Sequence, residues 1–298
     1  MRSSYSFSKY TDNEIKVFDD IIQQLDSKCK SETRNEPHFV EETLINTFEA
    51  VTEIKNYSMN ESNYRYKVYH LYREDINTGF EDDRNREVRI SITDLHIFVL
   101  TNESITQYII NKSSKDTAGK TLIRNLLGYE GRNEIELNNI NLLLVKDFYL
   151  WLFHVVLNGR DSEEEIIIES IEGYRGGNSN SLAHVTGIGS EVLNLLSTLT
   201  FIFESERINR VKVMIKYNTH KFSVDLYQNG NLKISFSEYE GDYDELAKYE
   251  SMAKIIFDVM LVVLPKLSAI YTKDEWDLHQ FKMDIGKEVV DKIEQKIH

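Results

Sequence analysis

The sequence predicts an α+β protein with an N-terminal lobe of mixed helices and strands and a C-terminal lobe built on an antiparallel sheet. Apolar residues recur at steps of three and four in some stretches, which indicates amphipathic helices. In other stretches they alternate with polar residues, which indicates strands. In the second half, three strand-like runs follow one another through tight turns, which favours antiparallel pairing.

The composition is that of a folded, acidic protein. The 298 residues are 41% hydrophobic and include 17 tyrosines and 14 phenylalanines, and the formal net charge is −14. A surface that binds duplex nucleic acid needs clustered lysine and arginine, so direct nucleic-acid binding is not expected. The acidity favours solubility and attraction to a basic partner, and it disfavours anionic membranes.

Cysteine usage and the N-terminus indicate a cytoplasmic protein. Cys29 is the only cysteine, which excludes an intrachain disulfide and suits a reducing compartment. Residues 1–7 lack the apolar stretch of a signal peptide. The longest apolar run, residues 255–264, is about ten residues long and contains Asp258, whereas a membrane span needs roughly 20.

The N-terminal lobe, residues 1–159, is expected to begin with two helices. Thr11 and Glu14 have the spacing of a capping box, which predicts a helix over residues 12–28, and apolar residues repeat at helical steps over residues 40–54. The other expected elements are strands over residues 64–69, 88–92, 95–100 and 134–137, and helices over residues 105–109, 117–127 and 145–157.

The C-terminal lobe, residues 160–298, follows a polar stretch that we take as a soft domain boundary. Asn229-Gly230 between alternating runs is a strong hairpin signal. The expected elements are a strand over residues 165–171, a glycine-rich loop over 173–181, a helix over 191–203, strands over 210–217, 221–227 and 232–236, a helix over 246–263 interrupted at Pro265, and a terminal helix over 274–297.

Motifs that would carry catalysis are missing from the sequence. There is no Gly-x-Ser-x-Gly elbow, and the eight histidines include no His-Glu-x-x-His or His-x-His pair. His96 and His154 lie in apolar stretches and are expected to be buried imidazoles, and Cys29 is expected to be a structural or exposed thiol. We therefore predict no catalytic residue, no metal and no cofactor.

Two surfaces are candidates for binding a protein partner. Arg175, in the glycine-rich loop, has a guanidinium that can grip a carboxylate or phosphate. The second candidate is the acidic stretch Glu238, Glu240, Asp242, Asp244 and Glu245, which matches a basic protein surface or mimics a phosphate array. A further acidic cluster comprises Glu74, Asp75, Glu81, Asp82 and Asp83.

The terminal helix is the candidate contact between copies of the chain. It has an apolar stripe that either docks on its own domain or packs across a symmetry axis. The candidate contact residues are Trp276, Phe281, Ile285, Val289 and Ile293.

Residues 187–203 and the two acidic stretches belong to a long, acidic chain rich in Asn, Lys, Ile and Tyr, without a catalytic signature. In these respects the chain resembles the phage-encoded Gabija anti-defence proteins. The resemblance implies a non-enzymatic inhibitor in the host cytoplasm. Such an inhibitor oligomerises, surrounds a bacterial nuclease–helicase defence complex and blocks its action on DNA. The resemblance transfers no individual functional residue.

Two other functions stay open at this point. A metal-dependent nuclease or defence effector could use the carboxylates of residues 163–169 beside Arg175, because divalent ions bind grouped carboxylates. A nucleotide or small-ligand sensor could hold an anion at a helix start over residues 187–190.

Overall fold

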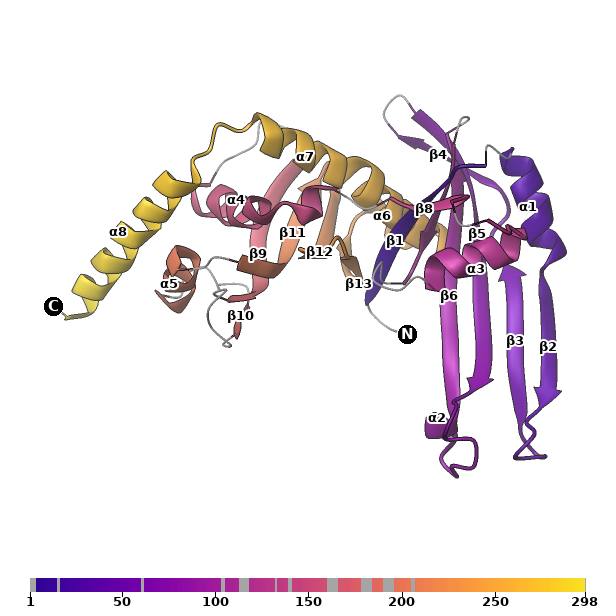
Figure 1. The fold of residues 1–298 in the computed structure, drawn as a ribbon. Coiled ribbons are helices and arrows are strands. Elements are labelled where there is room, and N and C mark those ends of the chain that lie inside the picture. The colour runs from indigo at the N-terminus through magenta and orange to yellow at the C-terminus, as the bar shows by residue number, and fades with distance from the viewer. Residues whose placement is uncertain are drawn as a thin grey trace. The chain divides into compact units, whose positions relative to one another are not determined.

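The fold is α+β, as predicted, and it ends in a long C-terminal helix (Figure 1). Strands pair antiparallel throughout the registers of both units. The computed structural model describes residues 4–14, 17–59, 62–102, 105–112, 118–131, 133–138, 141–159, 166–177, 184–189, 196–204 and 207–297.

The chain groups by its internal contacts into two compact units. The N-terminal unit comprises Phe7–Asn139 and Ala247–Ala253, and the C-terminal unit comprises Met1–Ser6, Ile140–Leu246 and Lys254–His298. The domain boundary expected at residues 159 and 160 stays a prediction, because units defined by contacts need not be domains that fold independently.

The N-terminal unit is a twisted sheet in the order β1-β7-β6-β5-β3-β2, with β4 pairing β5 and β8 pairing β1. The strands are β1 Ser4–Asp12, β2 Lys30–Asn35, β3 Thr43–Ala50, β4 Lys55–Met59, β5 Ser62–Ile76, β6 Ile90–Thr101, β7 Thr106–Ile110 and β8 Ile135–Leu137. The helices are α1 Phe18–Ser27, α2 Arg86–Arg89 and α3 Ala118–Leu127.

One face of this sheet carries the core of the N-terminal unit. Helices α1 and α3 lie against it (Figure 1), and their buried residues join those of β5, β6 and β7 in one apolar cluster. Ile21 and Leu25 project from α1, Ile123 and Leu127 from α3. Burial of these side chains stabilises the unit by about 1.5–3 kcal/mol for each large one.

The C-terminal unit has a sheet in the order β10-β9-β11-β12-β13. Its strands are β9 Ile166–Gly177, β10 His184–Ile188, β11 Arg207–Tyr217, β12 His220–Tyr227 and β13 Leu232–Glu240. Its helical segments are η1 Asn141–Leu144, α4 Lys146–Leu157, α5 Leu196–Glu204, η3 Asp242–Glu245, η4 Asp258–Val263, α7 Leu264–Lys273 and α8 Leu278–Ile297. Helix α4 packs on β9 and β11, so its aromatic residues fill the core of this unit.

The predicted turn between β12 and β13 is confirmed. Gly230 has a φ of 83°, and its N–H donates to the carbonyl of Tyr227. Positive φ is accessible to glycine at little cost, which is why the Asn-Gly pair marked this hairpin in the sequence.

The helix predicted over residues 40–54 is wrong, because Thr43–Ala50 forms strand β3. Leu44 and Phe48 are buried in the strand, whereas Val40 and Ile54 are exposed. A step of four residues returns to the same face of a strand as well as to the same face of a helix. The spacing was therefore compatible with both structures, and pairing with β2 and β5 decides for the strand.

The capping box predicted at Thr11 is wrong, because Thr11 lies in β1. The carboxylate of Asp12 accepts hydrogen bonds from the hydroxyls of Tyr108 at 2.6 Å and Tyr129 at 2.8 Å. Helix α1 begins only at Phe18.

The short helix predicted over residues 105–109 is also wrong, because Thr106–Ile110 is the interior strand β7. A five-residue run is too short for its period to distinguish a helix from a strand.

The helix predicted to end before Pro265 continues through it. Helix α6, Lys248–Phe257, runs into the π-helical segment η4 and then into α7. Pro265 lies in the first turn of α7, where a missing N–H is tolerated because η4 changes the hydrogen-bond spacing. By length and composition alone, Lys248–Lys273 could cross a membrane, but 56% of its most apolar window is buried, as in the core helix of a soluble protein.

Candidate functional site

The loop expected around Arg175 is a strand. β9 extends to Gly177, and Arg175 lies opposite Thr186 of β10 and Arg210 of β11. Its side chain is exposed and forms no ion pair with another described residue, whereas Arg210 is paired with Asp225 at 2.6 Å. Arg175 therefore remains an accessible cation, but it is fixed on a sheet rather than carried by a flexible loop.

Two of the five acidic candidates are neutralised by lysines on the same sheet. Lys212 of β11 lies 2.7 Å from Glu238 and 2.8 Å from Glu172, and Lys221 of β12 lies 3.4 Å from both Glu240 and Glu169. The hydrogen bond from Lys212 holds the pKa of Glu238 below its usual value. In this part of the predicted acidic patch, the glutamates are therefore paired with lysines on neighbouring strands.

The other three acidic candidates lie in η3, just after β13. Asp244 and Glu245 are exposed, and Asp242 accepts a hydrogen bond from the hydroxyl of Thr219 at 3.3 Å. Tyr243, between them, stacks on His220 with a ring-centroid distance of 4.4 Å. The aromatic contact anchors η3 and leaves Asp244 and Glu245 free to face solvent or a partner.

The second acidic cluster is divided between the interior and the surface. Glu74 is buried, and its carboxylate accepts hydrogen bonds from Arg86, from the hydroxyl of Tyr72 and from the backbone N–H of Ile45. Burial opposes ionisation of Glu74, but these donors outweigh it and hold its pKa below the usual value. Asp82, in contrast, has a nearly fully exposed side chain.

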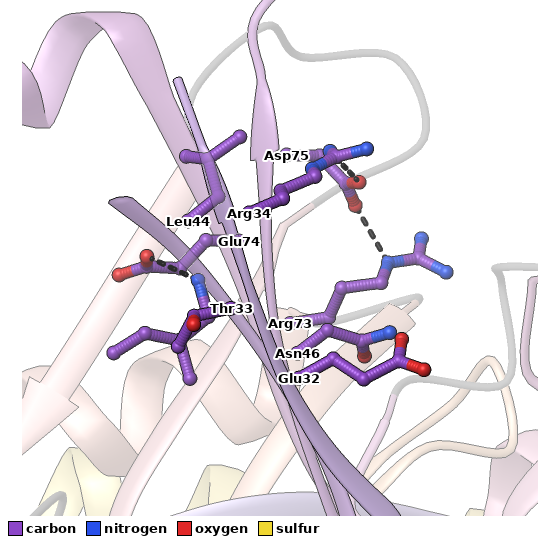
Figure 2. Close-up of a pocket in the computed structure, with 9 residues that line it drawn as sticks. Glu32, Thr33, Arg34, Leu44, Asn46, Arg73, Glu74 and Asp75 are labelled. Atoms are coloured by element: carbon purple, nitrogen blue, oxygen red, sulfur yellow. Dashed lines mark hydrogen bonds and ion pairs between the residues drawn. The ribbon is translucent and has the colours of Figure 1, made fainter. Parts of the chain in front are cut away.

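A pocket of about 300 Å³ opens beside Glu74, where β3 and β5 separate beyond their paired residues (Figure 2). Figure 2 shows Arg34 and Arg73 directed at one carboxylate, Asp75, with distances of 3.7 Å and 2.6 Å. Because the arginines are already paired, the pocket offers no unpaired cation to an anionic ligand. Its lining residues are Glu32, Thr33, Arg34, Leu44, Ile45, Asn46, Arg73, Glu74 and Asp75.

Part of the apolar stripe predicted on the terminal helix α8 is buried against its own unit. Phe281 and Ile285 are buried, and the helix packs against α4 and α5. Trp276 precedes the helix, and its ring lies 5.7 Å from that of His154 and 6.3 Å from that of Phe281, which are themselves 5.1 Å apart. These three candidate contact residues therefore hold α8 in place, and Val289 lies half-buried beside them.

A second apolar stripe on α8 faces solvent. We call Met283, Val290, Ile293 and Ile297 the outer stripe; their exposed fractions are 46%, 52%, 42% and 73%. Their steps of seven, three and four residues are those of a coiled-coil seam. The buried residues Phe281 and Ile285 project from a different side of the helix than the outer stripe. Of the predicted contact residues, only Ile293 belongs to the outer stripe.

The structure does not form the sites that the sequence suggested for the nuclease and for the ligand sensor in the residues that it describes. Gly187 lies in strand β10, so it does not start a helix as predicted, and residues 190–195 lie outside the described residues. Glu169 is engaged by Lys221, and residues 163–165 also lie outside the described residues. Neither arrangement gathers unpaired carboxylates or free helix N–H groups in the part of the chain that is described.

Comparison with known proteins adds no further assignment. No protein-family profile matches the chain, and no curated protein sequence matches it.

Proposed function

We propose that this protein is a non-enzymatic, cytoplasmic, protein-binding inhibitor that works as a dimer joined through helix α8. The observation that carries the proposal is the outer stripe, four apolar residues that stay exposed although α8 packs on α4 and α5 of its own unit. Aligned apolar residues at heptad spacing are the usual basis of helix pairing in water. Pairing two copies would remove this seam from solvent.

The charges beside the outer stripe favour an antiparallel pair. Lys287 and Glu294 lie along the same flank of α8, seven residues apart. In an antiparallel pair centred near Val290, Lys287 of one copy lies opposite Glu294 of the other. In the same arrangement Met283 meets Ile297 and Val290 meets Val290, whereas Ile293 lies beside Lys287 of the other copy.

Light scattering coupled to gel filtration tests the dimer. We expect the wild-type chain to elute at twice the monomer mass and Val290→Glu, which sets two glutamates opposite one another on the seam, to elute as a monomer. Gln295→Glu adds the same charge at an exposed position away from the outer stripe and should stay dimeric. A wild-type monomer at micromolar concentrations would remove the proposal's main support.

Charge exchange tests the antiparallel register. Lys287→Glu alone and Glu294→Lys alone each place like charges opposite one another and should weaken the dimer several-fold. The double variant restores opposite charges and should recover it. If both single variants dimerise as tightly as the wild type, this register is incorrect even where a dimer forms.

The partner would be met by the acidic surface outside α8. The net charge of −14 and the exposed carboxylates of Asp82, Asp244 and Glu245 favour association with a basic protein surface. The resemblance to Gabija anti-defence proteins makes the nuclease–helicase complex of that system the first partner to test. Co-expression with a tagged complex should give co-elution and loss of DNA cleavage. Cleavage that continues unchanged, without co-elution, would exclude this partner.

A further inference from the structure

Three neighbouring strands of the N-terminal unit bring two imidazoles and two carboxylates into one row. The strand register places Glu49 of β3 opposite His70 of β5, and His70 opposite His96 of β6. Asp94 lies two residues before His96 and therefore on the same face of the sheet. The ligand atoms available from His70, Asp94 and His96 all lie within 4.8 Å of one another.

The orientation of His70 suits a metal ligand. Its Nδ1 lies 3.5 Å from a carboxylate oxygen of Glu49, and its Nε2 lies 2.9 Å from Oδ1 of Asp94. A carboxylate that accepts the Nδ1 proton leaves the lone pair on Nε2, which is the arrangement of a carboxylate–histidine–metal triad. In the metal-free chain the 2.9 Å contact is a hydrogen bond in which Nε2–H donates to Asp94, so a metal ion bound between these two atoms displaces that proton.

His96 supplies the second imidazole. Its ring stacks on that of His70 at a centroid distance of 4.8 Å and an angle of 16°. The His96 side chain is buried, with 4% of its surface exposed. The Nδ2 atom of Asn111 lies 3.4 Å from Nδ1 of His96, which is a long hydrogen bond. Losing this bond when His96 binds a metal therefore costs little.

We propose that His70, Asp94 and His96 form a binding site for one zinc ion, with Glu49 orienting His70. Two imidazoles and a carboxylate are the ligands of an open zinc site, in which water takes the fourth position. Tetrahedral ligands at zinc lie about 3.3 Å apart, so the site closes when the stacked rings of His70 and His96 turn out of their present parallel planes. The exposed fraction of the Asp94 side chain is 54%, which leaves room for the ion and the water to approach from solvent.

Direct binding of zinc to the tag-free, full-length chain tests the site. Isothermal titration after chelator treatment should give one zinc ion per chain. Cobalt in its place should give the visible absorption of a tetrahedral complex. Asp94→Asn and His70→Ala should each weaken zinc binding at least tenfold. Both side chains are at least partly exposed, so the variants should fold even where a change at the buried His96 does not.

The control is His38→Ala. The imidazole of His38 also faces a carboxylate, that of Asp82 at 3.3 Å, but no second imidazole adjoins it in the described residues. Its loss should leave zinc affinity unchanged, and magnesium, which prefers oxygen ligands, should not compete. The absence of zinc binding, or binding that Asp94→Asn and His70→Ala leave intact, would overturn the proposal.

Discussion

The Nε atom of Arg89 donates a 2.6 Å hydrogen bond to Oε1 of Glu36, and both side chains are completely shielded from solvent. Arg89 also donates to Glu42 at 2.6 Å, and its guanidinium lies 3.7 Å from the ring centroid of Phe39. Through these contacts, one side chain at the end of α2 ties down the connection between β2 and β3. This is the most enclosed charge network among the described residues of the N-terminal unit.

Replacing Arg89 by methionine should lower the thermal unfolding midpoint markedly. The substitution keeps much of the side-chain volume but leaves the Glu36 carboxylate buried without a counter-charge, which is strongly unfavourable. Differential scanning calorimetry measures the change. Arg84→Met removes the same charge from a neighbouring exposed position and should leave the midpoint within a degree or two. Adding Glu36→Gln to Arg89→Met should recover part of the loss, and equal losses in both arginine variants would refute the prediction.

Glu74 should make the stability of the protein fall in acid. Its pKa is lower in the folded chain than in the unfolded chain, whose value is about 4.5, so the stabilisation is fully present above that pH. It is lost as the pH falls through the folded-state pKa. Urea unfolding at pH 7 should show Glu74→Gln less stable than the wild type by about 1–2 kcal/mol. The gap should narrow at pH 3, and a gap that does not depend on pH would contradict this account.

Gly241 should not tolerate a side chain. Its φ of 153° and ψ of −174° lie in a region that is essentially restricted to glycine. A Cβ atom there would also collide with Nδ1 of His220 and the hydroxyl of Tyr239, which are hydrogen-bonded at 2.6 Å. We expect Gly241→Ala to reduce the free energy of unfolding by about 1–3 kcal/mol. Gly79→Ala, at a φ of 88° with open space around it, isolates the backbone part of this cost and should be milder.

Cys29 should react slowly with thiol reagents. Burial is the main cause that raises the pKa of its thiol, and the negative charge of Asp26 adds to it, so little thiolate is present at pH 7. Modification by Ellman's reagent should be several-fold slower in the folded protein than in urea. A rate in the folded protein equal to that of free cysteine would show that the thiol is not shielded from solvent and that its pKa is not raised.

Much of the fold was predictable because many segments have a hydrophobic pattern that fits only one type of secondary structure. The helix at residues 146–157 is apolar over three turns, and the β12–β13 hairpin has an Asn-Gly turn between alternating runs. Strand β3 had no such signal, because Leu44 and Phe48 are four residues apart and suit a strand or a helix equally. Hydrogen-bonded pairing with β2 and β5 makes this segment a strand. Such pairing between distant segments is not visible in a local sequence pattern.

The candidate sites were harder to predict, because they depend on register. His70 and His96 are 26 residues apart in the sequence and form no recognised motif, yet the β5–β6 ladder places them opposite one another. In the same way, Lys212 reaches Glu238 only because β11, β12 and β13 are neighbours in the sheet. On α8 the exposed outer stripe could have been recognised from its heptad steps, but Phe281 and Ile285 gave the stronger apolar signal.

Strand β2 is the last strand at one edge of the N-terminal sheet, and all six of its residues are exposed. Lys30, Glu32 and Arg34 alternate along it. A strand from another molecule could add to this edge only by stripping water from these charges, which natural sheets use to prevent such growth. The charges of β2 therefore oppose the addition of a further strand at this edge, which is the step by which sheets extend into fibrils.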